Sequence, residues 1–364
     1  MDRNSLWKVL RKDGVPLKLI NIFRTIYDNT YCKVKAYNSY SNSFEVKKGV
    51  RQGAISSPML FNWGLDHVFG AALDKFDDGI ILGDGRRITD LTFADDIGLL
   101  ASSPDQLNNM LKKVASEGSK IGLIISVLKT KVMAIGEPLA NPISISEEAL
   151  DLVDCFKYLG SEISARGTAA CEIESRIRKA RAAFVQLRHL WKNRHISIAT
   201  KSRVYQTSVR SVLLYGCETW PLNQCHENQL QVFENRCLRQ ILKISILDQI
   251  PNVDIWNRFK LKDNISVLIK RRRLTWLGHV CRMHADRIVK ATLFHPIPPG
   301  TCRPPGGVRT TWLRKVFKDI DVPSVRRQSN VNYNNWKKNW LGFITTMAQD
   351  RLKFRKLIDG LCAS

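Results

Sequence analysis

The sequence predicts an α+β fold, in which antiparallel hairpins and helices come first and mostly helical segments follow. Three observations predict it. Apolar and polar residues alternate on both sides of turn-forming residues in 32–46 and in 87–101, as in β-hairpins. From residue 171 onward, apolar residues recur at helical spacing instead. The composition, 44% hydrophobic and 25% charged, is that of a folded globular protein.

Two helices are expected before the first hairpin. Residues 5–10 form a short helical stretch that closes near Gly14, and Pro16 is well placed to open the next helix. In that second helix, apolar residues at helical spacing predict one buried face; they are Leu19, Ile20, Phe23, Ile26 and Tyr27. The alternation in 32–46 then predicts a hairpin with one solvated face.

A glycine-bearing loop follows at 49–53. Gly49 and Gly53 let the backbone come close to a ligand, and Gln52 can both donate and accept hydrogen bonds. Arg51 can pair with a phosphate or with a carboxylate. The loop therefore predicts a ligand contact; the alternative is a flexible entry into an ordinary helix.

Two further helices are expected, one on either side of the second hairpin. The first begins at Pro58 with Ser56 or Ser57 as its cap, and its first amides suit an anion. The second begins at Ser103 and ends near Gly118. One face of this second helix is expected in the core, through Leu107, Met110, Leu111 and Val114.

The second hairpin carries two adjacent carboxylates, Asp95 and Asp96, at its tip. Adjacent Asp side chains repel each other unless a positive group neutralises them, and phosphate-handling enzymes use divalent cations for this. The pair therefore predicts a site for Mg²⁺, or for Mn²⁺ in its place. The alternative is that both residues only favour the turn.

Apolar residues in 121–127 predict a buried strand or the approach to one. Lys129 and Lys131 follow, either as surface charges or as contacts to a phosphate. Residues 138–145 form a Pro-containing connector, and 158–160 form a short turn.

Three helices are expected between residues 171 and 241. Their apolar stripes consist of Ile173, Ile177, Ala180, Phe184, Leu187 and Trp191, then Val204, Tyr205, Val209, Val212 and Leu213, then Leu230, Phe233, Cys237, Leu238 and Ile241. Basic residues, Arg176 and Lys179 among them, occupy the remaining face of the first helix.

Charge is distributed unevenly along the chain. The formal net charge is +24, and residues 161–364 hold 37 of the 57 Lys and Arg residues but only 14 of the 33 Asp and Glu residues. Because self-repulsion opposes such an excess, we expect a polyanion as the counter-charge. The alternative is a basic surface that only keeps the chain in solution.

The run from Lys270 to Arg273, with Trp276 and His279 close behind it, combines charge with rings that can stack on bases. This combination suits RNA or single-stranded DNA. The alternative is a solvated helix face, with Trp276 in the core. A Pro/Gly linker is expected near 294–307, followed by basic amphipathic helix.

Several classes of protein and site are excluded. No apolar run approaches the ~18 residues of a membrane-spanning helix, and the start lacks a signal peptide's order. We therefore expect an intracellular protein of the nucleus, the cytoplasm or both, without a membrane partner. Nine scattered Cys residues predict reduced thiols. Cys225, His226 and Cys237, or Cys281 and His284, do not supply four ligands at finger spacing, so zinc is not expected.

The motifs together resemble a known family. Phe93-Ala94-Asp95-Asp96 resembles the aromatic-x-Asp-Asp signature of reverse transcriptases, and 49–62 resembles their arginine-glutamine-glycine loop with its following helix. The segment 122–131 is similar to the family's lysine-bearing segment, with Ser126 where Asn is common, and 156–160 is similar to its primer-grip turn. Order and spacing resemble the non-LTR retrotransposon (LINE-type) branch, as do 213–220 and 273–280.

The resemblance implies an RNA-directed DNA polymerase, a nucleotidyltransferase that extends a DNA primer on an RNA template with deoxynucleoside triphosphates and two Mg²⁺ ions. It implies Asp95 as the stronger metal ligand and Asp96 as the weaker. The implied substrate contacts are Arg51, Gln52, Gly53, Ser57 and Phe93, with Lys129 or Lys131 near the triphosphate. The implied nucleic-acid contacts are Tyr158, Leu159, Gly160, Arg176, Lys179, Arg271, Arg272, Arg273 and Trp276.

The resemblance also implies three parts. Residues 1–165 would form a partial palm with an antiparallel sheet, 166–250 a helical thumb, and 251–364 a basic helical nucleic-acid-binding region. The family's third metal-binding Asp would lie just before Met1, and the fingers are absent, so we expect a truncated and impaired polymerase. The alternative is a catalytically inactive remnant that binds RNA or DNA through its basic C-terminal half.

Overall fold

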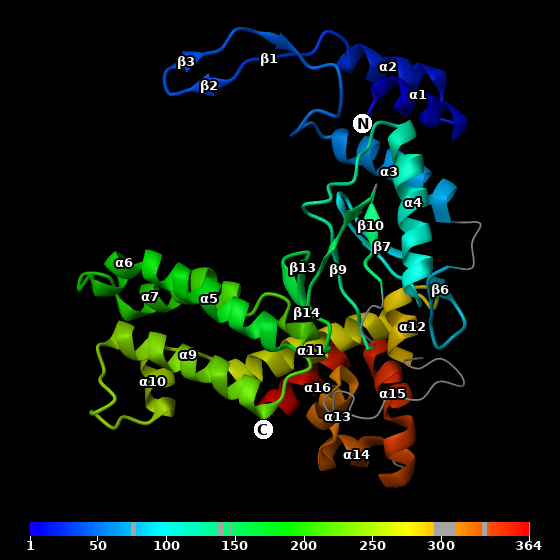
Figure 1. Cartoon of the computed structure of the whole chain (residues 1–364). Coiled ribbons are helices and arrows are strands. Elements are labelled where there is room, and N and C mark those ends of the chain that lie inside the picture. Colours follow the sequence, from blue (N-terminus) through cyan, green and yellow to red (C-terminus); the bar gives the residue numbers. More distant parts are fainter. Residues whose placement is uncertain (74–77, 137–140, 146, 295–310, 330–332, 364) are drawn as a thin grey trace. The chain divides into compact units, whose positions relative to one another are not determined.

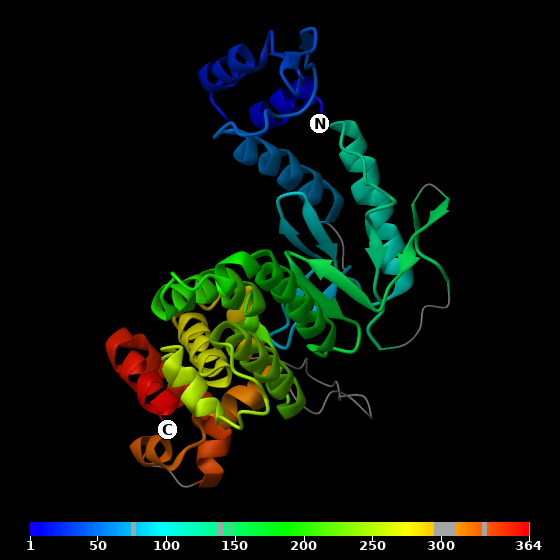
Figure 2. The same cartoon turned by 90° about the vertical axis from the view of Figure 1, so that its left-hand side faces the viewer.

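The computed structural model describes residues 1–73, 78–136, 141–145, 147–294, 311–329 and 333–363. The chain divides into two compact units, Met1–Val153 and Asp154–Ser364, each taken by itself below. Helices and small two-stranded sheets alternate in the first unit, and helices dominate the second (Figure 1, Figure 2). The expected connector residues 138–140 and linker residues 295–307 lie outside the described residues.

The helices of the first unit are α1 (Arg3–Lys12), α2 (Leu17–Tyr27), α3 (Ser57–Leu73) and α4 (Pro104–Lys120). Ser103 caps α4 as expected, since its hydroxyl accepts the amide of Gln106. Helix α4 packs against α3 through a shared apolar core that includes Leu65 and Met110.

The buried face of α2 is narrower than the sequence predicts. Ile20 and Tyr27 are buried, but Leu19 and Ile26 are 47% and 44% exposed. Helical spacing predicts which residues lie on one face of α2 but not how much of that face is covered. The neighbouring α1 covers only part of it.

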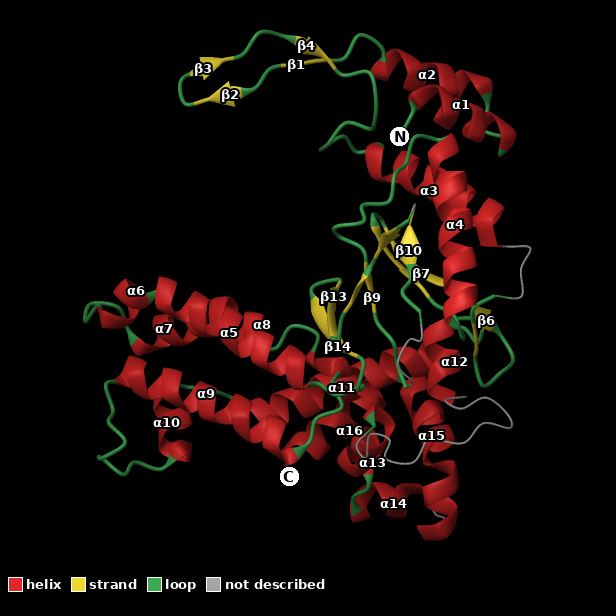
Figure 3. Ribbon diagram, in the orientation of Figure 1, coloured by secondary structure: helices red, strands yellow, loops and turns green. Residues whose placement is uncertain are grey.

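The strands of the first unit are short (Figure 3). They are β1 (Tyr31–Cys32), β2 (Lys35–Ala36), β3 (Ser39–Tyr40), β4 (Phe44–Glu45), β5 (Ile80–Ile81), β6 (Arg87–Ile88), β7 (Asp90–Phe93), β8 (Asp96–Leu99), β9 (Lys131–Val132), β10 (Ser144–Ile145), β11 (Glu148–Ala149) and β12 (Asp151–Leu152). The ladders β1–β4, β2–β3, β5–β6, β7–β8 and β10–β11 are antiparallel, whereas β9–β12 is parallel. The expected single antiparallel sheet is therefore replaced by separate two-stranded ladders.

Two local expectations in this unit are wrong. The strand residues of the hairpin β1–β4 are exposed on both faces, not on one. Residues 121–127 form no strand: Gly122, at φ +70°, ends α4, and the amide of Leu123 donates back to the carbonyl of Gly118. Beyond this turn Ile124 is 92% exposed.

The second unit begins with the hairpin β13 (Cys155–Tyr158) and β14 (Ser161–Ser164). Its helices are α5 (Ala170–Gln186), α6 (Arg188–Lys192), α7 (Ile198–Val204), the π-helix η1 (Tyr205–Arg210), α8 (Ser211–Leu213), the 3₁₀-helix η2 (Cys217–Thr219), α9 (Gln224–Leu242), α10 (Asn252–Arg258), α11 (Ile265–Arg282), α12 (Ile288–Phe294), α13 (Trp312–Ile320), α14 (Pro323–Ser329), α15 (Tyr333–Gln349) and α16 (Arg351–Ala363). The three helices expected between 171 and 241 are confirmed as α5 with α6, α7 with η1 and α8, and α9.

Two apolar cores lie in this unit, and α11 contributes to both. One core runs from Ala169 to Ile269, and the other from Leu274 to Leu361. Gly278 lets α16 approach α11, because a Cβ at this position would lie 2.3 Å from a ring carbon of Phe354. The glycine of the 273–280 motif thus serves close helix packing.

Cys155 and Cys171 form a disulfide between β13 and the first turn of α5, which corrects the expectation of reduced thiols throughout. The fold brings together two cysteines that lie 16 residues apart in the chain. The other cysteines in the described part of the chain are free. None of the described helices is long and apolar enough to cross a membrane.

Candidate functional site

The two carboxylates lie at the tip of the β7–β8 hairpin, as the sequence predicts. Phe93 pairs with Asp96 across the ladder, so Ala94 and Asp95 form the turn, with Ala94 at φ +52°. Asp95 and Asp96 are exposed, and neither side chain forms a hydrogen bond or ion pair with any described residue. Phe93 is 65% exposed beside them. The tip therefore offers carboxylate oxygens to a cation from solvent.

Within the described part of the chain, no third acidic side chain joins this pair. Among the described residues, no three His, Cys, Asp or Glu side chains gather as a metal site. Asp90 lies at the far end of the same ladder and accepts hydrogen bonds from the hydroxyls of Thr89 and Thr92. Asp2 caps α1 by accepting the amide of Ser5, and this hydrogen bond lowers the pKa of Asp2.

The two candidate lysines have different surroundings in the structure. Lys131 lies on β9 beside Asp151 of β12, and its ammonium is 2.5 Å from that carboxylate. Lys129 lies in the turn before β9; it is exposed and forms no side-chain hydrogen bond or ion pair with a described residue. Of these two lysines, Lys129 is therefore the one whose charge is not paired with a carboxylate.

The glycine-bearing loop keeps two of its predicted residues open. Gly49 and Gly53 have φ values of +77° and +86°, a conformation that glycine adopts at little cost. Gln52 and Gly53 are exposed. The backbone at this turn is thus accessible, as a ligand contact requires.

The other two predicted residues of this region face the interior of the first unit. The Arg51 guanidinium donates to the Thr30 hydroxyl at 2.8 Å and lies 5.8 Å from the centre of the Tyr27 ring. Ser57 is buried, and its hydroxyl lies 2.8 Å from that of Tyr27. Arg3 covers the same ring and donates to the carbonyls of Gly49 and Tyr27. These contacts hold the loop in place, and they bury the Ser57 hydroxyl inside the unit.

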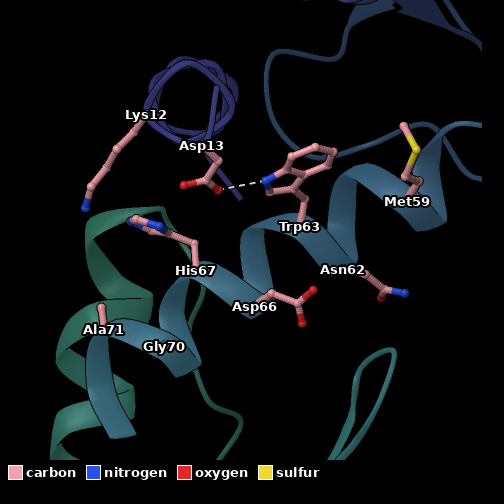
Figure 4. A pocket seen from close by; sticks show the side chains of 9 residues that line it. All are labelled: Lys12, Asp13, Met59, Asn62, Trp63, Asp66, His67, Gly70 and Ala71. Carbon is pink, nitrogen blue, oxygen red and sulfur yellow. Dashed lines mark hydrogen bonds between the residues drawn. The ribbon is translucent and has the colours of Figure 1, made fainter. Parts of the chain in front are cut away.

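A cleft of about 1020 Å³ opens between α1 and α3, and none of the sequence-predicted residues lines it (Figure 4). The Trp63 indole donates to the Asp13 carboxylate at 2.7 Å across it. Lys12 and His67 point toward one side of the cleft, and Asp66 points to the other. Polar residues that interrupt the apolar pattern of 57–73 are the sequence signal for this open face.

In the second unit, the side chains of Tyr215 and Arg176 hold the turn between β13 and β14. Leu159 and Gly160 have φ values of +48° and +84°. The Tyr215 hydroxyl donates to the Leu159 carbonyl at 3.2 Å, and the Arg176 guanidinium donates to the Gly160 carbonyl. Sequence reasoning missed Tyr215 here, although it belongs to the 213–220 motif.

The contacts of Arg176 correct its expected role at a phosphate. Its side chain is 7% exposed and pairs with Glu172 at 2.6 Å, and its guanidinium lies 4.4 Å from the centre of the Tyr215 ring. Glu172 also accepts the amide of Glu162 on β14. Arg176 therefore joins α5 to the hairpin. Lys179, one turn away, forms no hydrogen bond or ion pair with a described residue.

Two arginines of the basic run form bonds within the second unit. Arg273 is buried there, which leaves it no surface for nucleic acid, whereas Arg272 is half-buried and its contact with nucleic acid stays a prediction. Arg273 is 1% exposed and pairs with Asp319 of α13. Arg272 donates to the carbonyl of Leu214 at 2.9 Å. Both guanidiniums are used in packing between helices.

The outer residues of the run also contact their own chain. Arg271 pairs with Asp263 and with Asp359 of α16, and Lys270 donates to the carbonyl of Leu361. Trp276 is half-buried with its ring 5.4 Å from that of His279, so it stays available at a surface.

Comparison with known proteins identifies the family of the first unit's motifs. Residues 4–163 match the family described as reverse transcriptase (RNA-dependent DNA polymerase), and residues 183–215 match a domain of unknown function. A transposon-derived protein of Caenorhabditis elegans is 32% identical over 216 residues, which cover 56% of this chain and 75% of that protein.

Two further relatives bear names of polymerases. A protein of Drosophila melanogaster named as an RNA-directed DNA polymerase from transposon BS is 27% identical over 62% of this chain. A Pol polyprotein from a type-1 retrotransposable element R2 of Nasonia vitripennis is 27% identical over 48% of it. The chain spans only 26% and 18% of these two relatives. With motifs, hairpin geometry and relatives in agreement, this chain belongs to the reverse transcriptase family, in the LINE-type branch of RNA-directed DNA polymerases.

Proposed function

We propose that this chain is the polymerase segment of a LINE-type retrotransposon, which transfers nucleotides from deoxynucleoside triphosphates to a primer 3′-hydroxyl on an RNA template. The observation that carries the proposal is the exposed pair Asp95 and Asp96, placed without a protein partner at the tip of β7–β8 within the matched segment. Its partners are then an RNA template and a DNA primer, inside the cell.

The donor set at the tip fits Mg²⁺, because this ion prefers carboxylate oxygens and water as ligands. Asp95 and Asp96 would hold it, with Asp95 as the stronger ligand. Bound Mg²⁺ would stabilise charge on the attacking and leaving oxygens of the phosphoryl transfer. Two carboxylates hold two ions poorly, and the described residues add no third at this place. We therefore propose that polymerisation by this chain is impaired.

Other residues of the first unit take separate roles in the proposal. Gln52 and Gly53 contact the template or the incoming nucleotide, because both are exposed at the loop turn. Arg51 and Ser57 position that loop through Tyr27. The Lys129 ammonium lies open to the triphosphate and can protonate the leaving pyrophosphate.

The regional division is also a proposal. Residues 1–165 correspond to a partial palm, 166–250 to a thumb and 251–364 to a nucleic-acid-binding region. The turn at Tyr158, Leu159 and Gly160 would contact the primer, supported by its attachment to α5 through Arg176. The excess of basic residues in 161–364 supports the binding role of the other two parts.

Primer extension by the full chain tests the proposal. We expect weak Mg²⁺-dependent incorporation on a poly-A template, and we expect Asp95→Asn to reduce it about 1000-fold or more because a metal ligand is lost. Asp28→Asn, which changes an exposed carboxylate of the same unit that has no side-chain partner, is the matched control. Incorporation that survives Asp95→Asn would overturn the assignment of the metal site.

Mn²⁺ binding, measured by the electron paramagnetic resonance signal of the ion, tests the metal site independently of polymerisation. The wild type should bind the ion and the double variant Asp95→Asn, Asp96→Asn should not. Since no third carboxylate of the described residues joins the pair, a second candidate function is a remnant that binds nucleic acid without polymerising. In that case the wild type incorporates no nucleotide with Mg²⁺ or with Mn²⁺, yet it still binds RNA.

A further inference from the structure

A basic cleft of about 1080 Å³ lies in the second unit, between α11, α16 and the segment before α11. Among the residues that line it, seven are Lys, Arg or His and three are Asp or Glu. Helices α11 and α16 pack directly against each other through Gly278 and Phe354. The walls of the cleft are therefore fixed by the core of the unit.

The cations of this cleft fall into two groups. Arg271, Arg272 and Arg282 donate to groups of the chain itself, as described above for the first two and to the carbonyl of Ala348 for the third. The remaining basic side chains are exposed and form no hydrogen bond or ion pair within the described structure; they are Lys262, His279, Arg351 and Arg355. The charge that is open to a ligand thus comes mainly from α16, which lies outside the arginine run.

The open groups are arranged in two pairs. Arg351 and Arg355 are four residues apart on α16, so they project from one face of that helix. On α11, Trp276 and His279 place their rings 5.4 Å apart at the opposite wall. One wall can therefore neutralise phosphates while the other presents rings on which a base can stack.

We infer that this cleft binds a single strand of RNA or DNA, with its phosphates on Arg351 and Arg355 and a base on Trp276. The volume is near that of a site for a small ligand (roughly 300–1,000 Å³), which accommodates a short stretch of one strand. An acidic peptide would meet the cations but would leave the stacking wall unused. The inference rests on the proposed nucleic-acid function of the second unit and assigns that function to a place.

Fluorescence anisotropy of a labelled single-stranded poly-U oligonucleotide with the full chain tests the inference. The variant Arg351→Gln, Arg355→Gln should weaken binding about tenfold at ~150 mM salt, because two phosphate contacts are lost. The slope of log affinity against log salt concentration should become shallower by about 1.4, since each contact on a single strand contributes about 0.7.

The matched control is Lys353→Gln, Lys356→Gln, which removes the same charge from the same helix at positions that do not line the cleft. It should change affinity less than about threefold. Equal weakening by both double variants would overturn the inference, because net charge alone would then explain binding. Competition by poly-glutamate as strong as that by poly-U would overturn the choice of ligand.

A separate variant tests the wall formed by Trp276 and His279. Trp276→Leu should weaken binding while leaving the salt slope unchanged, because it removes a ring and no charge. The polymerase assignment fails separately, when the wild type incorporates no nucleotide with Mg²⁺ or with Mn²⁺. A chain whose cleft variants bind like wild type while Asp95→Asn abolishes incorporation would overturn this inference alone.

Discussion

Arg176 illustrates how a single side chain can be assigned to the wrong environment by its charge. Its guanidinium, together with Glu172, joins α5 to the β13–β14 turn. Arg176→Ala should lower the free energy of unfolding by about 3–5 kcal/mol, because Glu172 is left buried without its partner. Urea denaturation measures the loss. The slope of log RNA affinity against log salt concentration should be the same for this variant as for wild type. A shallower slope for the variant would show that Arg176 does contact a phosphate.

His226 gives the chain a pH dependence whose sign follows from burial. Burial lowers the pKa of His226 from its ordinary 6.5, so the unfolded chain binds a proton at pH values where the folded chain does not. The stability contributed by neutral His226 is complete above pH 6.5 and is lost as the pH falls toward the folded pKa.

The advantage of wild type over His226→Gln in free energy of unfolding should therefore be larger at about pH 7.5 than at about pH 5.5. Urea denaturation at both pH values checks it. An advantage that is equal at the two pH values would show that this imidazole does not titrate differently on folding.

At the scale of elements, the contact between α11 and α16 depends on Gly278. Gly278→Ala raises helix propensity by up to about 1 kcal/mol but pushes the new methyl group into the Phe354 ring. We expect a net destabilisation of about 1–3 kcal/mol. In a double-mutant cycle, Phe354→Leu should recover part of that loss. Stabilisation by Gly278→Ala alone would contradict the close approach of the helices.

Local patterns predicted most elements and little of their pairing. The β7–β8 hairpin, α4 and the helices of 171–241 follow from periodicity and capping, which operate within a few residues. Two-residue strands such as β9 and β12 carry no pattern that could predict their parallel ladder. The apolar residues of 121–127 favour a strand locally, but Gly122, at φ +70°, turns the chain directly after α4.

The arginine run could have been predicted differently from helix geometry alone. Successive residues of a helix are rotated by roughly 100°, so four consecutive basic residues point around nearly the whole helix. On a helix that contributes to two cores, some of them must face inward. Arg273 is the residue that does so most completely, with 1% of its side chain exposed.

At the scale of the molecule, composition predicts a polyanionic ligand but no place for it. The excess of basic residues in 161–364 predicted a polyanion, and the motifs predicted the carboxylate tip. The open cations Arg351 and Arg355 lie more than seventy residues after Trp276 in the chain. Only the packing of α16 on α11 brings them to one cleft, and no sequence pattern records that packing.

The burial of Arg273 has a consequence for how copies of this gene diverge. Substitution of Arg273 leaves Asp319 buried without a partner, so any copy whose product must still fold is constrained there. Arg351 and Arg355 form no ion pair or hydrogen bond with another described residue, so they can be substituted once binding is no longer selected. In decaying copies Arg273 would thus persist longer than the two arginines of the last helix, whose substitution would mark the loss of binding.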